Sequence, residues 1–263
     1  SAVLLGTLYP LFLDALGAGK ISVGPPYFDS VFGPLMFPML FLLGVAPFAR
    51  WKEADTLELA KKLGWVFALS LAAGAVIPFL MGRWSHWVFI GCTLAVWVAA
   101  TAVYNIIDRG RNMKGGFFAK LAQHPRAFWG MQLAHIGVAV FVIGVALVKG
   151  YPAERNVRMY VGEQVTVAEY TFVFNGTKET RGANYQAVEG DFTVLKAGKE
   201  LTHLYPQKRN YFSSRSMPMT EAAIRHSITG DVYVSLGEPT PDGAWIVRAY
   251  AKPFVTWIWW GAI

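Results

Sequence analysis

Long apolar runs separated by short charged stretches dominate the first 148 residues of the chain. This pattern predicts about five membrane-spanning helices, the first of them partial and broken by Pro10. The expected segments are Ala2–Leu16, Val31–Ala49, Leu63–Leu80, Trp84–Tyr104 and Phe128–Val148. The last segment contains no formal charge. At about 1.5 Å per residue its length is roughly 31 Å, which matches the hydrocarbon core of a bilayer.

The pattern of hydrophobic and polar positions changes after residue 148. Residues 149–252 hold short aromatic and β-branched runs separated by Gly, Asn and Asp, which is typical of antiparallel strands. The stretch Met217–Ile224 (MPMTEAAI) is the one part of this region that the pattern does not predict as a strand. Residues 253–263 begin a further transmembrane helix. The predicted fold class is a polytopic α-helical membrane protein with a small extracytoplasmic antiparallel β-domain.

Composition and charge agree with this division. The chain is 54% hydrophobic and 16% charged, which does not describe one soluble globule. Of the net charge of +7, residues 1–148 carry +5 (11 Lys and Arg against 6 Asp and Glu) and residues 149–263 carry +2 (13 against 11). The loops 50–62 and 105–126 hold nine basic residues, against two in the links on the other side. We interpret this bias as an orientation signal that places residues 149–252 outside, and not as a nucleic-acid footprint.

Other sequence features restrict the class of protein. Cys92 is the only cysteine, so the chain has no disulfide and no C-x-x-C-H motif of a c-type cytochrome. Neither end resembles a signal peptide, and we expect the chain to be a part of a larger membrane protein, cut at both ends. Asn175-Gly-Thr177 matches a glycosylation sequon, but we interpret these residues as a hairpin turn.

His135 is the strongest candidate for a functional residue because it lies inside the apolar segment Phe128–Val148. An ionisable side chain at membrane depth is costly and is a functional-site hypothesis by default. On a helical wheel it faces away from a smooth stripe that favours close helix contact. This stripe consists of Gly130, Ala134, Gly137 and Gly144. Three roles remain open for His135: a hydrogen bond to a neighbouring helix, metal or haem ligation, and proton transfer.

The other four histidines are weaker candidates. His86 lies roughly 17 Å from His135 in depth, and His124 belongs to the cytoplasmic loop, so neither is expected to share a haem with His135. We interpret His86 as part of an aromatic belt at the outer interface. His203 and His226 are expected to be ordinary surface histidines. A second haem ligand would therefore lie on a segment outside this chain.

Several stretches resemble the C-terminal half of the CcmF-type cytochrome c haem lyase family, and they follow the family's order over nearly the whole chain. They are LLGTLYPLFLDALGAGKISVGPPYF (4–28), WGMQLAHIGVAV (129–140), SMPMTEAAI (216–224), DVYVSLGEP (231–239) and DGAW…YAKPFVTWIW (242–259). The resemblance implies a bacterial inner-membrane protein of the cytochrome c maturation system, with residues 149–252 in the periplasm.

The resemblance also implies an activity and partners. The intact protein would be an enzyme, a haem lyase and haem oxidoreductase, that takes haem from a periplasmic haem chaperone and attaches it to the CXXCH motif of apocytochrome c. It would hold a b-type haem in the membrane, and the histidine of LAHIGVAV, His135, matches an axial ligand of that haem iron. Implied partners are the N-terminal part of the same protein, the chaperone, apocytochrome c, its thiol-handling and presenting subunits, and the lipid bilayer. No catalytic residue is assigned.

Two alternatives belong to other functional classes. The chain could be half of a transporter or channel in which His135 lies in a proton or substrate path, and proline-broken helices suit that class. It could also be a non-catalytic docking scaffold whose β-domain binds partners. A transporter would be colourless when purified, whereas a haem protein would not.

Overall fold

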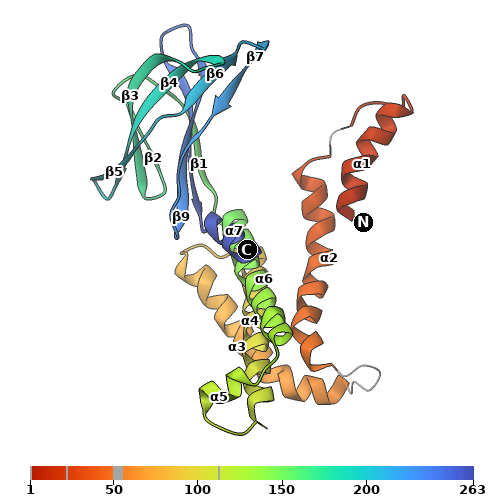
Figure 1. Cartoon of the computed structure of the whole chain (residues 1–263). Coiled ribbons are helices and arrows are strands. Elements are labelled where there is room, and N and C mark those ends of the chain that lie inside the picture. The colour runs from red at the N-terminus through yellow and green to blue at the C-terminus, as the bar shows by residue number, and fades with distance from the viewer. Residues whose placement is uncertain (1, 22, 50–55, 112) are drawn as a thin grey trace. The chain divides into compact units, whose positions relative to one another are not determined.

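A computed structural model describes the chain apart from residues 1, 22, 50–55 and 112 (Figure 1). The chain divides into two compact units, residues 1–142 and residues 143–263. The first unit is helical and the second is built mainly of strands.

Apolar helices make up the first unit. Their bounds are α1 (Ala2–Ala15), α2 (Pro25–Val45), the 3₁₀ turn η1 (Ala46–Phe48), α3 (Thr56–Leu80), α4 (His86–Arg111), α5 (Phe117–Ala122) and α6 (Arg126–Gly150). In the described part of the chain, four helices are long and apolar enough to cross a membrane: α2 continued by η1, α3, α4 and α6. Helix α1 is apolar but shorter. The predicted class of polytopic helical membrane protein is confirmed.

Several helices extend beyond the apolar runs that predicted them. Helix α2 begins at Pro25, earlier than expected, because proline has its φ angle preset for a helix and needs no N–H partner in the first turn. Helix α4 continues to Arg111, and the short helix α5 follows within the expected loop 105–126. The hydrogen bonding within these helices therefore continues beyond the apolar residues that are expected to lie in the membrane.

Helix α4 packs closely against its neighbours through glycines. A Cβ atom added at Gly74 of α3 would lie 2.2 Å from Thr93 Oγ1 and 2.8 Å from the Thr93 backbone. A Cβ atom at Gly44 of α2 would lie 2.3 Å from the Trp97 indole nitrogen. That nitrogen donates to the Phe41 carbonyl oxygen at 2.9 Å. Small residues allow this close approach of helices, which is how membrane helices gain most of their packing energy.

The second unit contains the last turns of α6, ten strands and helix α7 (Val255–Ala262). The strands are β1 (Ala153–Met159), β2 (Gln164–Val167), β3 (Tyr170–Arg181), β4 (Tyr185–Lys196), β5 (Lys199–Leu204), β6 (Gln207–Tyr211), β7 (Ser214–Glu221), β8 (Ala223–Arg225), β9 (Gly230–Pro239) and β10 (Trp245–Pro253). They form two sheets, ordered β1-β10-β9-β8 and β2-β3-β4-β6-β7, with β5 also paired to β4. Every pairing is antiparallel. The predicted antiparallel β-domain is confirmed.

A single apolar core lies between the two sheets. Phe174 and Phe192, on neighbouring strands, stack with their ring centroids 4.9 Å apart. Val234 and Val247 from the other sheet belong to the same buried cluster. Because side chains alternate between the two faces of a strand, each sheet directs one face inward and leaves the other for polar residues.

The interpretation of Met217–Ile224 is wrong, because this stretch forms strand β7 and the start of β8. Strand β7 pairs only with β6 and is an edge strand, with Met219 opposite Arg209. Proline cannot donate to a sheet ladder and is tolerated at such an edge, which explains Pro218. Met, Glu and Ala favour helices in isolation, but pairing with an existing sheet overrides this preference.

The hairpin-turn interpretation of Asn175-Gly-Thr177 is also wrong, because these residues lie within strand β3. Gly176 has a φ angle of +134°, and the register between β3 and β4 shifts at Phe174 and Gly176. This is a β-bulge, for which glycine supplies a backbone conformation that other residues rarely adopt.

Candidate functional site

His135 lies in α6, and its two ring nitrogens have different surroundings. Nδ1 is 2.7 Å from the carbonyl oxygen of Met131, one helical turn earlier. Because a carbonyl oxygen only accepts, this contact assigns the proton to Nδ1. Nε2 is buried and has no hydrogen-bond partner among the described residues. In the neutral tautomer with the proton on Nδ1, the lone pair of Nε2 lies in a buried position.

This arrangement fits a histidine that ligates iron. Metal-bound histidines usually donate their other N–H to a carbonyl or carboxylate, which fixes the tautomer and orients the ring. A buried polar atom without a partner is costly, and an iron atom would satisfy Nε2. The described residues contain no group of three or more His, Cys, Asp or Glu side chains that would hold a metal ion. A porphyrin already supplies four nitrogens, so iron in haem needs only axial ligands from the protein.

A polar contact next to His135 joins three elements of the helical unit. Gln132 of α6 is buried, and its Nε2 donates to Asn105 Oδ1 of α4 at 2.9 Å. Asn105 Nδ2 in turn lies 3.5 Å from the carbonyl oxygen of Pro47 in η1. Sequence reasoning missed this contact, although an amide side chain in an apolar segment is a signal for interhelical hydrogen bonding. The contact ties α6 to α4 and η1 three residues before His135.

His124 lies just before α6 and is more buried than the predicted loop position suggests, at 7% exposure. Its ring stacks on Phe128 with centroids 4.3 Å apart. The guanidinium of Arg109, on α4, lies 5.3 Å from the centroid of the same phenylalanine. These contacts hold the beginning of α6 against the end of α4. His86 is the first residue of α4 and contacts the edge of Trp84, so its interfacial role stays a prediction.

Part of the predicted glycine stripe on α6 is used for close packing. A Cβ atom added at Gly144 would lie 2.8 Å from the backbone nitrogen of Ile258 in α7. At Gly130 an added Cβ would meet nothing within 4 Å. Gly144 therefore allows α7 to lie close to the end of α6.

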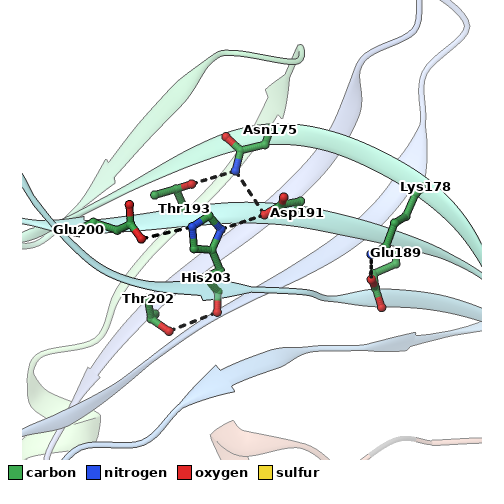
Figure 2. Close-up of polar contacts among 8 residues, drawn as sticks. All are labelled: Asn175, Lys178, Glu189, Asp191, Thr193, Glu200, Thr202 and His203. Atoms are coloured by element: carbon green, nitrogen blue, oxygen red, sulfur yellow. Dashed lines mark hydrogen bonds and ion pairs between the residues drawn. The ribbon is translucent and has the colours of Figure 1, made fainter.

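His203 is not an ordinary surface histidine, because both of its ring nitrogens face carboxylates (Figure 2). Nδ1 lies 3.2 Å from Asp191 Oδ1 and Nε2 lies 3.3 Å from Glu200 Oε1. Asn175 donates to the same Asp191 oxygen and to Thr193 Oγ1. The hydrogen bond to Asp191 is the main cause that raises the pKa of His203. This polar cluster joins β3, β4 and β5 on the outer face of their sheet.

The same face carries a second polar group farther along the sheet. Lys178 of β3 pairs with Glu189 of β4 at 2.9 Å, as Figure 2 shows. Gln207 of β6 donates to the other oxygen of Glu189. These hydrogen bonds, from Gln207 first and then from Lys178, lower the pKa of Glu189. The polar side chains named on this face are bonded to one another, and the face suits contact with water.

Comparison with known proteins identifies a family match for the β-domain. The family described as "CcmF C-terminal beta-sandwich" matches residues 150–253. These residues span all ten strands.

Whole-chain relatives extend the match to the helices. The chain is 43% identical over 263 residues to the "Cytochrome c-type biogenesis protein CcmF" of Pseudomonas fluorescens, covering 100% of this chain and 39% of the relative. It is 40% identical to the protein of the same name from Escherichia coli K12, covering 99% of this chain and 39% of the relative. The chain thus spans about two fifths of the length of the curated relatives it matches.

A solved structure has the same fold. It is named "Cytochrome c Heme Lyase CcmF", and it superposes with a TM-score of 0.76 at 22% identity, covering 99% of this chain and 41% of the other. At that identity the match supports the arrangement of helices and strands. Taken with the relatives and the matched β-sandwich, it confirms the resemblance drawn from the motifs: the chain corresponds to the C-terminal part of a CcmF-type cytochrome c biogenesis protein.

Proposed function

We propose that this chain forms part of a cytochrome c haem lyase in a bacterial inner membrane, contributing an intramembrane site for a b-type haem and a periplasmic β-domain. The whole protein takes haem from a periplasmic haem chaperone and attaches it to the CXXCH motif of apocytochrome c. The names of the relatives and of the solved structure support this general role. Because the chain spans about two fifths of those relatives, the rest of the protein contributes to this activity.

The observation that carries the proposal is that His135 combines a buried, unpartnered Nε2 with an Nδ1 bonded to the Met131 carbonyl oxygen. A bound b-type haem would supply a one-electron redox centre whose potential depends on its axial ligands and its burial. Met131 accepts the Nδ1 proton through its carbonyl oxygen and so keeps Nε2 free to ligate iron. The contact between Gln132 and Asn105 ties α6 to α4 three residues before His135.

The β-domain has the features of a partner-binding module outside the membrane. The basic loops of the helical part orient residues 149–252 away from the cytoplasm. The domain has its own apolar core, so it keeps its shape while its outer faces meet other proteins. Its partners would be the haem chaperone, and apocytochrome c with the subunits that handle its thiols and present it.

The test is to replace His135 by Ala in the intact protein and to record its absorption spectrum after purification. Loss of the axial ligand removes or strongly reduces the b-type Soret band. His86→Ala, which changes a histidine at the end of another helix, is the matched control and keeps the band. An unchanged Soret band in His135→Ala would remove His135 from the ligand set, and a colourless wild-type protein would favour the transporter alternative.

A further inference from the structure

His226 lies in the loop between β8 and β9 and pairs with the buried carboxylate of Asp231 in β9. Its Nδ1 lies 2.7 Å from Asp231 Oδ2. The side chain of His226 is 72% exposed, whereas that of Asp231 is 6% exposed. A carboxylate accepts a hydrogen bond from Nδ1–H, so the neutral ring presents its other nitrogen, Nε2, as a lone-pair donor. No described residue bonds to Nε2.

Asp231 is itself held in place, and this fixes the direction of the imidazole. Its Oδ1 accepts from the backbone N–H of Ser227 at 3.2 Å, and the Thr256 hydroxyl oxygen lies 3.2 Å from the same carboxylate oxygen. Buried carboxylates that orient a histidine in this way are characteristic of metal-binding histidines. His203 differs in this respect, since carboxylates face both of its nitrogens and leave neither free.

Exposed apolar side chains lie two residues before and two residues after His226. Ile224, in β8, is 48% exposed, and Ile228, in the turn closed by the hydrogen bond from Gly230 N–H to the Ser227 carbonyl oxygen, is 72% exposed. An exposed imidazole between two exposed isoleucines suits a metal ion that is carried in an apolar ligand better than a hydrated metal ion.

The outer face of the adjoining sheet adds an aromatic surface and positive charge. Ile224 pairs with Tyr233 of β9 in the strand register. The ring of Tyr233 stacks on that of Tyr250 with centroids 4.4 Å apart. The ammonium of Lys252 lies 5.5 Å and 5.7 Å from these two ring centroids. Arg248 is exposed on the same face of β10.

The loop is also tied to helix α7, which is expected to return into the membrane. Thr256 Oγ1 donates to the Ser227 carbonyl oxygen at 3.0 Å. The indole N–H of Trp257 donates to the Ile228 carbonyl oxygen at 3.0 Å. These bonds hold His226 at the junction between the β-domain and α7, where an apolar ligand would meet the membrane surface.

We propose that His226 ligates the iron of a haem that binds at the edge of the four-stranded sheet, as a site separate from His135. Its Nε2 replaces a water or another weak axial ligand on the iron, and no electron is transferred in this step. Ile224 and Ile228 would offer apolar surface to the porphyrin, and Lys252 would offer a positive charge to a propionate. The assignment of haem as the ligand rests on the proposed function.

The test is a titration of ferric haem into the intact protein, followed through the Soret band. His226→Gln retains an N–H donor for Asp231 but loses the imidazole, and its affinity for added haem falls by at least about tenfold. Asp231→Asn weakens binding by about 10- to 100-fold, the usual range for a residue that orients a metal ligand. His203→Gln is the matched control on the same domain and binds like the wild type. Equal haem affinity in wild type and His226→Gln overturns the inference.

Iron-free protoporphyrin tests whether the metal is required. If His226 acts through iron, iron-free protoporphyrin binds wild type and His226→Gln with the same affinity. If His226→Gln loses affinity for iron-free protoporphyrin as it does for haem, the histidine acts by packing alone and the inference is overturned. The same titrations in His135→Ala separate the two proposals. A resident b-type band that survives in His135→Ala contradicts the intramembrane site, while loss of added haem in His226→Gln alone still supports the site at the sheet edge.

Discussion

At the scale of single residues, the partners of the ring nitrogens distinguish His135, His226 and His203 from one another. In His135 one nitrogen is bonded to a carbonyl oxygen and the other is buried without a partner. In His226 one nitrogen is bonded to a carboxylate and the other is open to solvent. In His203 both nitrogens face carboxylates. An imidazole with one free nitrogen can ligate iron, whereas one held between two carboxylates is stabilised in its protonated form.

The raised pKa of His203 predicts a pH dependence of local stability. A raised folded-state pKa means that the folded domain binds the proton more tightly than the unfolded chain, so the contribution is present below the ordinary value of 6.5 and is lost as pH rises through the raised pKa. Hydrogen exchange of β4 and β5 should therefore become faster above that range, beyond the intrinsic pH effect. In His203→Gln this additional acceleration should be absent. If both proteins show the same pH profile, the ion pairs contribute nothing measurable.

At the scale of elements, glycines determine how closely the helices approach. Gly74 on α3 lies against Thr93 of α4, while Gly64 on the same helix has open space around its Cα. An added methyl group would therefore meet the backbone of Thr93 at Gly74 and no atom within 4 Å at Gly64. Helix packing in membranes depends on such close contacts, because lipid chains are as apolar as the side chains they would replace.

Gly74→Ala should lower the thermal stability of the detergent-solubilised protein. The methyl group would lie 2.2 Å from Thr93 Oγ1 and 2.8 Å from the Thr93 backbone, so α3 and α4 must separate, at a cost of about 1–3 kcal/mol. Gly64→Ala is the matched control and should be neutral or stabilising, since alanine is a better helix former by up to about 1 kcal/mol. Equal unfolding temperatures for the two variants would show that α3 and α4 do not pack in this way.

At the scale of the whole molecule, the chain consists of a helical unit and a β-rich unit with separate interiors. The proposed function requires the β-rich unit to face the periplasm. The excess of Lys and Arg in the loops around residues 50–62 and 105–126 predicts that side through the positive-inside rule. The orientation can be measured independently of haem.

The orientation predicts which positions react with a membrane-impermeant maleimide. Cys92, the only cysteine in this chain, is buried and should react little. Lys199→Cys, at the exposed start of β5 in the β-domain, should be labelled in intact spheroplasts. Lys114→Cys, in the predicted cytoplasmic loop, should be labelled only after the membrane is permeabilised. The opposite pattern would place the β-domain in the cytoplasm and contradict the proposed function.

The fold class and the membrane segments could be predicted from the residues alone, because both depend on periodicities that are local in the chain. A run of about 20 apolar residues has few alternatives to a membrane helix, and alternating β-branched residues indicate strands. The singular position of His135 in such a run made it a candidate. Its family motif then supplied the expectation of haem.

Which polar groups meet could not be predicted, because it depends on the folded arrangement of distant segments. Gln132 and Asn105 are 27 positions apart, and His203 and Asp191 are 12 positions apart, so no local pattern predicts either contact. The same holds for Met217–Ile224, whose composition favours a helix, although most of the stretch forms a strand because it pairs with β6. Hydrogen bonding and burial depend on neighbours that folding brings together, and they distinguish His226 beside a buried Asp231 from a histidine on an open surface.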